Sequence, residues 1–130
     1  CLCHESFLYN VLEGKRKDYY ETHKNLNHAL YRSDLLYSPD VLFVREQESK
    51  KCDVITCAAP NKGAAQKYQN QSDEVVKAAM FDRIDHILYA AQLNHVDTLI
   101  LGAFGCGVFG NDAKEVAEIF QDFLEFKYYH

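Results

Sequence analysis

The sequence has no long hydrophobic run and no excess of positive charge, and each absence excludes a class of protein. No stretch approaches the roughly 18 consecutive apolar residues that can cross a bilayer. The 130 residues include 14 Lys and Arg against 19 Asp and Glu, a formal net charge of −5, whereas proteins that bind the nucleic-acid backbone need a basic face. A basic start followed by an apolar core, the pattern of a secretion signal, is also missing. We therefore expect a cytoplasmic protein that binds neither nucleic acid nor membrane.

The composition is that of a globular domain, with 48% hydrophobic and 25% charged residues. A chain of 130 residues is one domain or part of one. Five cysteines without regular spacing indicate reduced thiols. Cys1-x-Cys3-His4 has the form of half a zinc site, but no second Cys/His pair follows at finger spacing. We therefore expect no metal and no bound cofactor.

Hydrophobic periodicity predicts an alternation of strands and helices. In chain order the predicted elements are a helix over residues 2–12, β-rich runs at 35–37 and 41–44 around Ser38-Pro39-Asp40, a polar loop at 46–51, a buried strand at 52–59, a loop at 64–71, a long helix capped by Ser72, a buried strand at 98–101 and a helix after Asp112. The buried stripe of the long helix consists of Val75, Val76, Ala79, Met80, Ile84, Ile87, Leu88 and Ala91. Residues 19–31 give a mixed signal. This order favours an α/β fold with parallel neighbouring strands and helices on both faces of the sheet.

Four of the six glycines lie between Gly102 and Gly110, after the predicted strand at 98–101. Asp112 and Glu115 have the spacing of a capping box at the start of a helix, whose apolar face would be Val116, Ile119, Phe120, Phe123 and Leu124. A strand, a glycine loop and a helix in this order often cradle phosphate, because glycine lets backbone N–H groups turn toward an anion. The Asp112 carboxylate would occupy the helix N-terminus, so we expect the anion on loop amides rather than on the helix dipole.

Three alternatives apply to this loop. Glycines also serve tight packing between strand and helix, without any ligand. The letters GCGVFG match the dinucleotide pattern G-x-G-x-x-G, but the helix signal comes after the glycines and no acid-tipped strand follows. Cys106 could be a nucleophile near a helix N-terminus, although no base lies beside it in the sequence and a packed loop residue is the favoured role.

Four segments together resemble the microbial-type poly(ADP-ribose) glycohydrolase (PARG) family: LYNVL, YSPDVLFVR, VITCAAPN and LILGAFGCGVFGND. The resemblance implies a three-layer α/β/α macro domain with a mostly parallel central sheet that binds ADP-ribose. It also implies that residues 1–130 form a single, partial macro domain, incomplete at the N-terminal end and at the C-terminal end. The partner would be ADP-ribose or an ADP-ribosylated protein.

The same resemblance implies roles for individual residues. The segment Gly105, Cys106, Gly107, Val108, Phe109 and Gly110 would wrap the pyrophosphate, and Phe109 would pack against the ribose whose bond is cut; packing in the core alone is the alternative for Phe109. Pro60, Asn61 and Asn111 would line the same pocket. The two segments that end at residues 61 and 110 follow predicted strands, so they would meet at one cleft.

The family's catalytic element is a Gly-Gly-Gly stretch followed by Gln-Glu-Glu, and this sequence lacks it. Cleavage of a glycosidic bond needs a carboxylic acid with a raised pKa, and Glu5 lies near the expected point without matching it. We therefore name no catalytic residue. A partial sheet would expose an apolar face, so we expect a homo-oligomer or association with the missing N-terminal part. The functions left open are PARG-like hydrolysis by a longer form, a non-catalytic ADP-ribose reader, and a dehydrogenase-type nucleotide domain.

Overall fold

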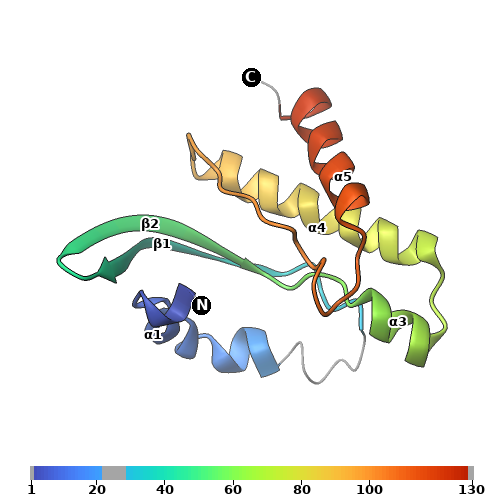
Figure 1. The fold of residues 1–130 in the computed structure, drawn as a ribbon, viewed down its shortest axis with the longest axis horizontal. Helices are drawn as coiled ribbons and strands as arrows, with labels where there is room; N and C mark the ends of the chain where they lie inside the picture. Colours follow the sequence, from blue (N-terminus) through green and yellow to red (C-terminus); the bar gives the residue numbers. More distant parts are fainter. Residues whose placement is uncertain (1, 22–28, 129–130) are drawn as a thin grey trace.

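The computed structural model describes residues 2–21 and 29–128. Figure 1 shows a long β-hairpin. The first helices lie beside it, and the later helices are grouped toward its open end, away from the turn that joins the strands. No helix among these residues is both long and apolar enough to cross a membrane. The elements in chain order are η1 (Leu2–His4), α1 (Leu8–Glu13), the π-helix η2 (Arg16–Glu21), β1 (Leu35–Arg45), β2 (Glu48–Cys57), α3 (Lys62–Gln69), α4 (Asp73–Leu93) and α5 (Ala113–Phe126).

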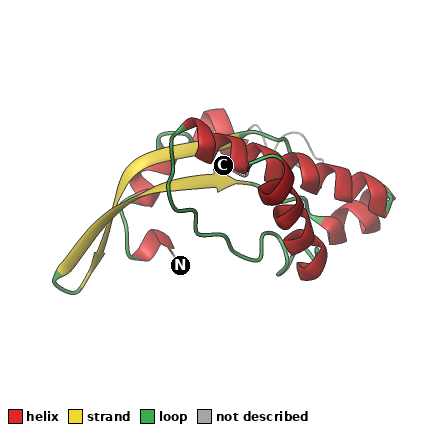
Figure 2. Cartoon of the chain, turned by 90° about the horizontal axis from the view of Figure 1, so that it is seen from above, coloured by secondary structure: helices red, strands yellow, loops and turns green. Residues whose placement is uncertain are grey.

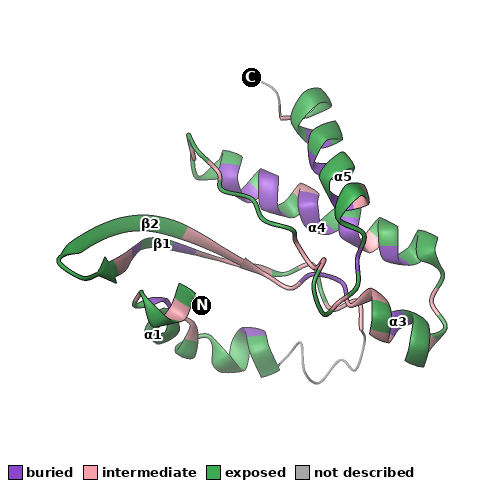
Figure 3. Ribbon diagram, in the orientation of Figure 1, coloured by how far each residue is buried: buried purple, intermediate pink, exposed green. Residues whose placement is uncertain are grey.

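The core lies between α4 and α5, whose facing sides are buried (Figure 3). The predicted stripe of α4 and the predicted apolar face of α5 supply it, and both N-caps, Ser72 and Asp112, are confirmed. Val75 and Leu124 were predicted on these faces, but they are 43% and 41% exposed, and neither belongs to the buried cluster. The buried cluster consists of Met80, Ile84, Leu88, Val116, Ile119, Phe120 and Phe123.

The two strands form an antiparallel hairpin that runs from the pair Leu35–Cys57 to the pair Arg45–Glu48. The register shifts between Ser38 and Val41, where the sequence contains proline and where Asp40 has a positive φ of 54°. The two β-rich runs around this point are therefore one bulged strand, as bulges allow. The predicted bend lies inside β1 and does not end it.

The predicted helix over residues 2–12 is divided into η1 and α1. The amide of Phe7 donates to the Leu42 carbonyl at 3.1 Å, and the Glu5 carbonyl accepts from the Val44 amide at 2.7 Å. Pairing with the free edge of β1 thus takes the backbone groups that a continuous helix would use. Of the mixed stretch 19–31, the first residues belong to η2 and residues 22–28 lie outside the described part.

Two predicted loops are in fact regular elements. Residues 48–51 belong to β2, because cross-strand backbone bonds hold polar residues in a hairpin whose exposed side needs no apolar side chain. Residues 64–69 belong to α3, which Asn61 caps by accepting from the Ala64 amide at 3.0 Å. The helix is anchored by Ala65, which is fully buried.

The predicted buried strand at 98–101 is wrong for this structure. Residues 97–101 make no backbone hydrogen bond to any described residue, and Ile100 is 93% exposed. Of residues 97–101, only Leu99 packs against the core. The strands in the described ranges are β1 and β2, which curve as one ribbon beyond the helices in Figure 2. The chain is α/β in its elements, but its sheet is antiparallel and two-stranded, because an apolar run becomes a strand only beside a partner.

Candidate functional site

The glycine loop is tied to the end of the hairpin by one buried side chain. The Asn111 amide nitrogen Nδ2 donates to the carbonyls of Pro60 and Gly105, at 2.8 Å each. The Asn111 backbone amide also donates to the Gly105 carbonyl at 3.2 Å. Asn111 is 8% exposed and Pro60 is fully buried. The structure thus brings together the two segments that the sequence predicts at one cleft.

A second tie connects the loop to the start of α3. The Gly63 amide donates to the Phe109 carbonyl at 3.1 Å. Asn61 is occupied by structure: its side chain caps α3, and its backbone amide donates to the Ala29 carbonyl at 2.8 Å. The three residues predicted to line the pocket, Pro60, Asn61 and Asn111, therefore form the frame that holds the loop.

Within this frame, three successive amides point to no internal acceptor. The N–H groups of Gly107, Val108 and Phe109 donate to no carbonyl or side chain in the described ranges. By contrast, the amides on either side of them are hydrogen-bonded: the Cys106 amide donates to the Ala103 carbonyl, and the Gly110 amide donates to the Gly107 carbonyl. Val108 is 99% exposed. A run of successive amides without an acceptor among the described residues is a suitable site for an anion.

The three glycines of the segment 105–110 differ in backbone conformation and in the space around them. Gly105 has a φ of +72°, and a Cβ at this position would lie 2.7 Å from Ala59 Cβ and 2.7 Å from Asn111 Nδ2. Gly110 has a φ of +73° but open space around it, and Gly107 has open space and no positive φ. Packing thus explains Gly105, backbone conformation explains Gly110, and neither explains Gly107.

Asp112 begins α5 as predicted, since its carboxylate accepts from the Glu115 amide at 2.9 Å. The reciprocal half of the capping box is replaced by an ion pair, in which Glu115 lies 3.1 Å from the Lys77 ammonium. A carboxylate at the helix N-terminus leaves the loop amides as the place for an anion. The helix starts after the last glycine, which disfavours the dinucleotide alternative.

The thiol of Cys106 is not activated. Burial, followed by the nearby Asp112 charge, raises the pKa of Cys106. Its Sγ lies 3.5 Å from the Phe104 carbonyl oxygen, and the residue packs against the core. These contacts support the packed role over the nucleophile, because a reactive cysteine needs a lowered pKa. Among the described residues, no group of three His, Cys, Asp or Glu could hold a metal ion, and Cys1 lies outside that part.

One residue of the site was missed by sequence reasoning. The Tyr31 ring lies 6.1 Å from the Phe109 ring, centroid to centroid, with 38° between the planes. Tyr31 comes from the segment that precedes β1, far from the loop in sequence. A single tyrosine in a stretch of mixed pattern carries no periodic signal, so this contact is visible only in three dimensions.

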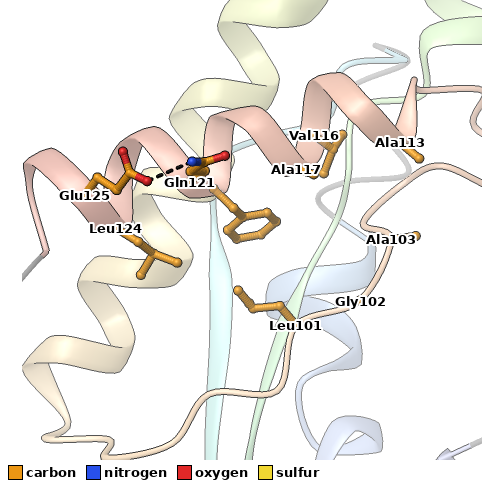
Figure 4. A pocket seen from close by; sticks show the side chains of 10 residues that line it. Leu101, Gly102, Ala103, Ala113, Val116, Ala117, Gln121, Leu124 and Glu125 are labelled. Carbon is orange, nitrogen blue, oxygen red and sulfur yellow. Dashed lines mark hydrogen bonds between the residues drawn. The ribbon is translucent and has the colours of Figure 1, made fainter.

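A hollow of about 630 Å³ lies between residues 101–103, at the start of the glycine loop, and one face of α5. Figure 4 shows that its wall is mostly apolar and that Gln121 bonds to Glu125 along the helix. None of the residues predicted to bind pyrophosphate lines it.

Comparison with known proteins gives two kinds of match. Residues 1–46 match the family model described as "Microbial-type PARG, catalytic domain". PARG from Deinococcus radiodurans in complex with ADP-ribose is 33% identical with a TM-score of 0.90, over 96% of this chain and 53% of that chain. PARG from Thermomonospora curvata bound to the inhibitor ADP-HPD is 33% identical with a TM-score of 0.87, over 94% of this chain and 47% of that chain. No curated protein matched the sequence.

The fold and these matches define an α/β protein related to bacterial poly(ADP-ribose) glycohydrolases. Within that class, the chain is a relative of the microbial type, as its resemblance in sequence indicates. It spans about half the length of the solved structures that it matches.

Proposed function

We propose that this chain binds ADP-ribose through its glycine loop, as the pyrophosphate-binding part of a PARG-like hydrolase. The observation that carries the proposal is the run of three unpaired amides at Gly107, Val108 and Phe109, on a loop fixed at both ends by Asn111 and Gly63. A loop held in place in this way loses less conformational entropy when it binds a diphosphate. The solved relative that is in complex with ADP-ribose supports this choice of ligand.

On this proposal, residues 1–130 are part of a macro domain of three layers. The proposed contacts to the pyrophosphate come from the backbone of residues 105–110, and Phe109 packs beside the ribose. The hydrolysis of ADP-ribose linkages belongs to a longer form that supplies the acid. The protein partner would then be an ADP-ribosylated protein.

One observation favours a reader as the second candidate. The carboxyl groups in the described ranges whose pKa is shifted are Asp53, Glu74 and Asp85, and each pKa is lowered. A general acid at a glycosidic bond needs a raised pKa. None of these shifted carboxyl groups has the raised pKa of a general acid, so the second candidate is a module that binds ADP-ribose without cleaving it.

The proposal is tested by calorimetric titration of ADP-ribose into the chain and into the Gly107→Glu variant. Position 107 has open space, so the new side chain should leave the fold intact while filling the anion space with a like charge. Gly102→Glu is the matched control, because Gly102 also has open space but lies outside the three-amide run.

We expect binding by the wild-type chain and by Gly102→Glu, and none by Gly107→Glu. Equal binding by all three would show that the loop amides are not the cradle. No binding by a folded wild-type chain would count against the proposal for this chain. Release of free ADP-ribose from an ADP-ribosylated protein, measured beside the titration, separates the hydrolase from the reader.

A further inference from the structure

The segment just before β1 is fastened to the frame of the proposed site. The Ala29 carbonyl accepts from the Asn61 amide at 2.8 Å, and the Ala29 amide donates to the Gln69 side chain at 3.3 Å. Ser33 is hydrogen-bonded to Asp82 of α4. These contacts bring the two residues between Ala29 and Arg32 against α3, α4 and the glycine loop.

Tyr31, in the middle of this segment, has a backbone conformation that favours glycine. Its φ is +57°, the left-handed region, which is uncommon for a bulky residue. Such a conformation persists only where the surroundings hold it, and it tends to occur at functional sites. A glycine here would remove the strain, so the tyrosine side chain is the feature that needs an explanation.

One group that holds the backbone of Tyr31 is the buried guanidinium of Arg83. Its Nη2 donates to the carbonyls of Leu30 and Tyr31, at 2.6 Å and 3.0 Å. Arg83 is 1% exposed, forms no ion pair with a described carboxylate, and leaves its Nε and Nη1 without hydrogen-bond partners. An apolar residue of similar size would often stabilise a core better than an incompletely satisfied buried cation. The arginine is therefore better explained by the backbone that it positions than by stability.

The electrostatic surroundings of Arg83 support this interpretation. Burial lowers the pKa of Arg83 itself. Burial also raises the pKa of the Cys57 thiol to about 11, and raises the pKa of the Tyr19 phenol to about 12. Both neighbours are protonated at neutral pH, so the nearby negative charges are those of Asp82 and Asp34, which act on Arg83 without forming an ion pair with it. The two carbonyls remain the acceptors that the guanidinium engages.

The result is a pair of aromatic rings beside the free amides. The Tyr31 and Phe109 rings are both partly exposed and lie 6.1 Å apart. Phe109 is fixed through its own carbonyl by Gly63 at 3.1 Å, and Tyr31 is fixed through its carbonyl by Arg83. Two rings held by their backbones can accept a flat base or a furanose against their faces without rearranging.

We propose that Tyr31 is a ligand-contacting residue that forms, with Phe109, an aromatic subsite for a ring of ADP-ribose, and that Arg83 is its positioning residue. This inference rests on the proposed function. It adds a contact from the segment before β1 to a site otherwise built from the glycine loop. On this proposal, Arg83 affects binding by holding the backbone carbonyl of Tyr31 and thereby positioning the Tyr31 ring.

The test uses calorimetric titration of ADP-ribose into variants at Tyr31 and Arg83, with urea unfolding of each. Tyr31→Gly removes the ring and relieves the positive φ, so the unfolding midpoint should stay the same or rise while the affinity falls about tenfold or more, the usual effect of losing one stacking partner. Tyr31→Phe keeps the ring and should keep the affinity. A merely structural role would make affinity follow stability, which is the opposite pattern for Tyr31→Gly.

Arg83 is tested by its coupling to Tyr31. Arg83→Lys retains the charge, but the shorter lysine side chain ends before the position of Nη2, the atom that donates to both carbonyls. It should therefore weaken binding in the wild-type chain and have no further effect in the Tyr31→Gly background. Arg32→Lys, on the exposed neighbouring residue, is the matched control and should change nothing. Equal weakening by Arg83→Lys in both backgrounds, or full affinity of Tyr31→Gly, would overturn the inference.

This outcome is distinct from failure of the proposed function. If wild-type chain binds ADP-ribose and Gly107→Glu does not, the loop proposal stands whatever Tyr31→Gly does. If Tyr31→Gly binds normally in that case, only the aromatic subsite is wrong. If the folded wild-type chain does not bind ADP-ribose, both are wrong.

Discussion

Replacement of Gly105 by alanine should be among the most damaging single-methyl changes in this protein. The new Cβ would lie 2.7 Å from both Ala59 Cβ and Asn111 Nδ2, and neither neighbour can yield, since both are buried and Asn111 is held by two hydrogen bonds. A left-handed alanine costs about 1–2 kcal/mol, and overpacking costs about 1–3 kcal/mol. The sum is a loss of about 2–5 kcal/mol, a large part of the stability of a small domain.

The other loop glycines provide a graded comparison for the same urea unfolding assay. Gly110→Ala has the positive φ without the clash, so it should cost only about 1–2 kcal/mol. Gly107→Ala has neither, so it should be neutral or stabilise by up to about 1 kcal/mol through the unfolded state. The predicted order of stability is therefore Gly107→Ala, then Gly110→Ala, then Gly105→Ala. A Gly105→Ala chain as stable as Gly110→Ala would refute the packing argument.

Three further predictions concern other parts of the chain. Asn111→Leu keeps the volume but removes both side-chain bonds to carbonyls, so thermal unfolding should show a loss of about 1–3 kcal/mol; an unchanged midpoint would contradict it. Ile100→Lys should change urea stability by less than about 0.5 kcal/mol because the side chain is 93% exposed, whereas Ile84→Ala, at a fully buried position, should cost about 2–5 kcal/mol. Burial favours the neutral form of Asp85, but its bonds to Lys127 and Tyr128 outweigh burial and lower its pKa. Its stabilising contribution should therefore be complete above the unfolded pKa of about 3.9 and be lost as the pH falls through the lower folded value, so Asp85→Asn should flatten the acid limb of stability measured against pH.

The exposed apolar residues make self-association a further expectation. Ile100, Val108 and Phe126 are 93%, 99% and 83% exposed, and apolar surface of this kind favours association where it is contiguous. We expect the isolated 130-residue chain to sediment as an oligomer. A compact monomer at micromolar concentration would contradict this.

Hydrophobic periodicity and capping residues predicted the elements whose structure is determined by their local sequence. The helices α4 and α5 were predicted because their apolar stripes repeat at helical spacing and because Ser72 and Asp112 are residues that accept from backbone amides. The glycine loop was found for the same reason, since its sequence pattern is local. The stripe of α4 was right in its centre and wrong only at margins such as Val75.

The remaining elements depend on contacts that no local pattern contains. The polar half of β2 is a strand because β1 lies beside it, whereas the apolar run at 98–101 is not a strand because no segment of the described chain pairs with it. The helix α3 (KGAAQKYQ) has few large apolar residues and is held by Ala65 and the Asn61 cap. Tyr31 contacts Phe109, and Arg83 contacts Tyr31, across long sequence separations, so these contacts are visible only after folding.

The most direct test of the account is to follow backbone amide resonances by NMR while ADP-ribose is added to the 130-residue chain. We predict that the largest shifts occur at the amides of Gly107, Val108 and Phe109, and that inorganic pyrophosphate alone moves the same three. Shifts concentrated instead around Leu101 and the facing side of α5, or no shifts in a folded chain, would contradict the claim that the glycine loop is the anion cradle.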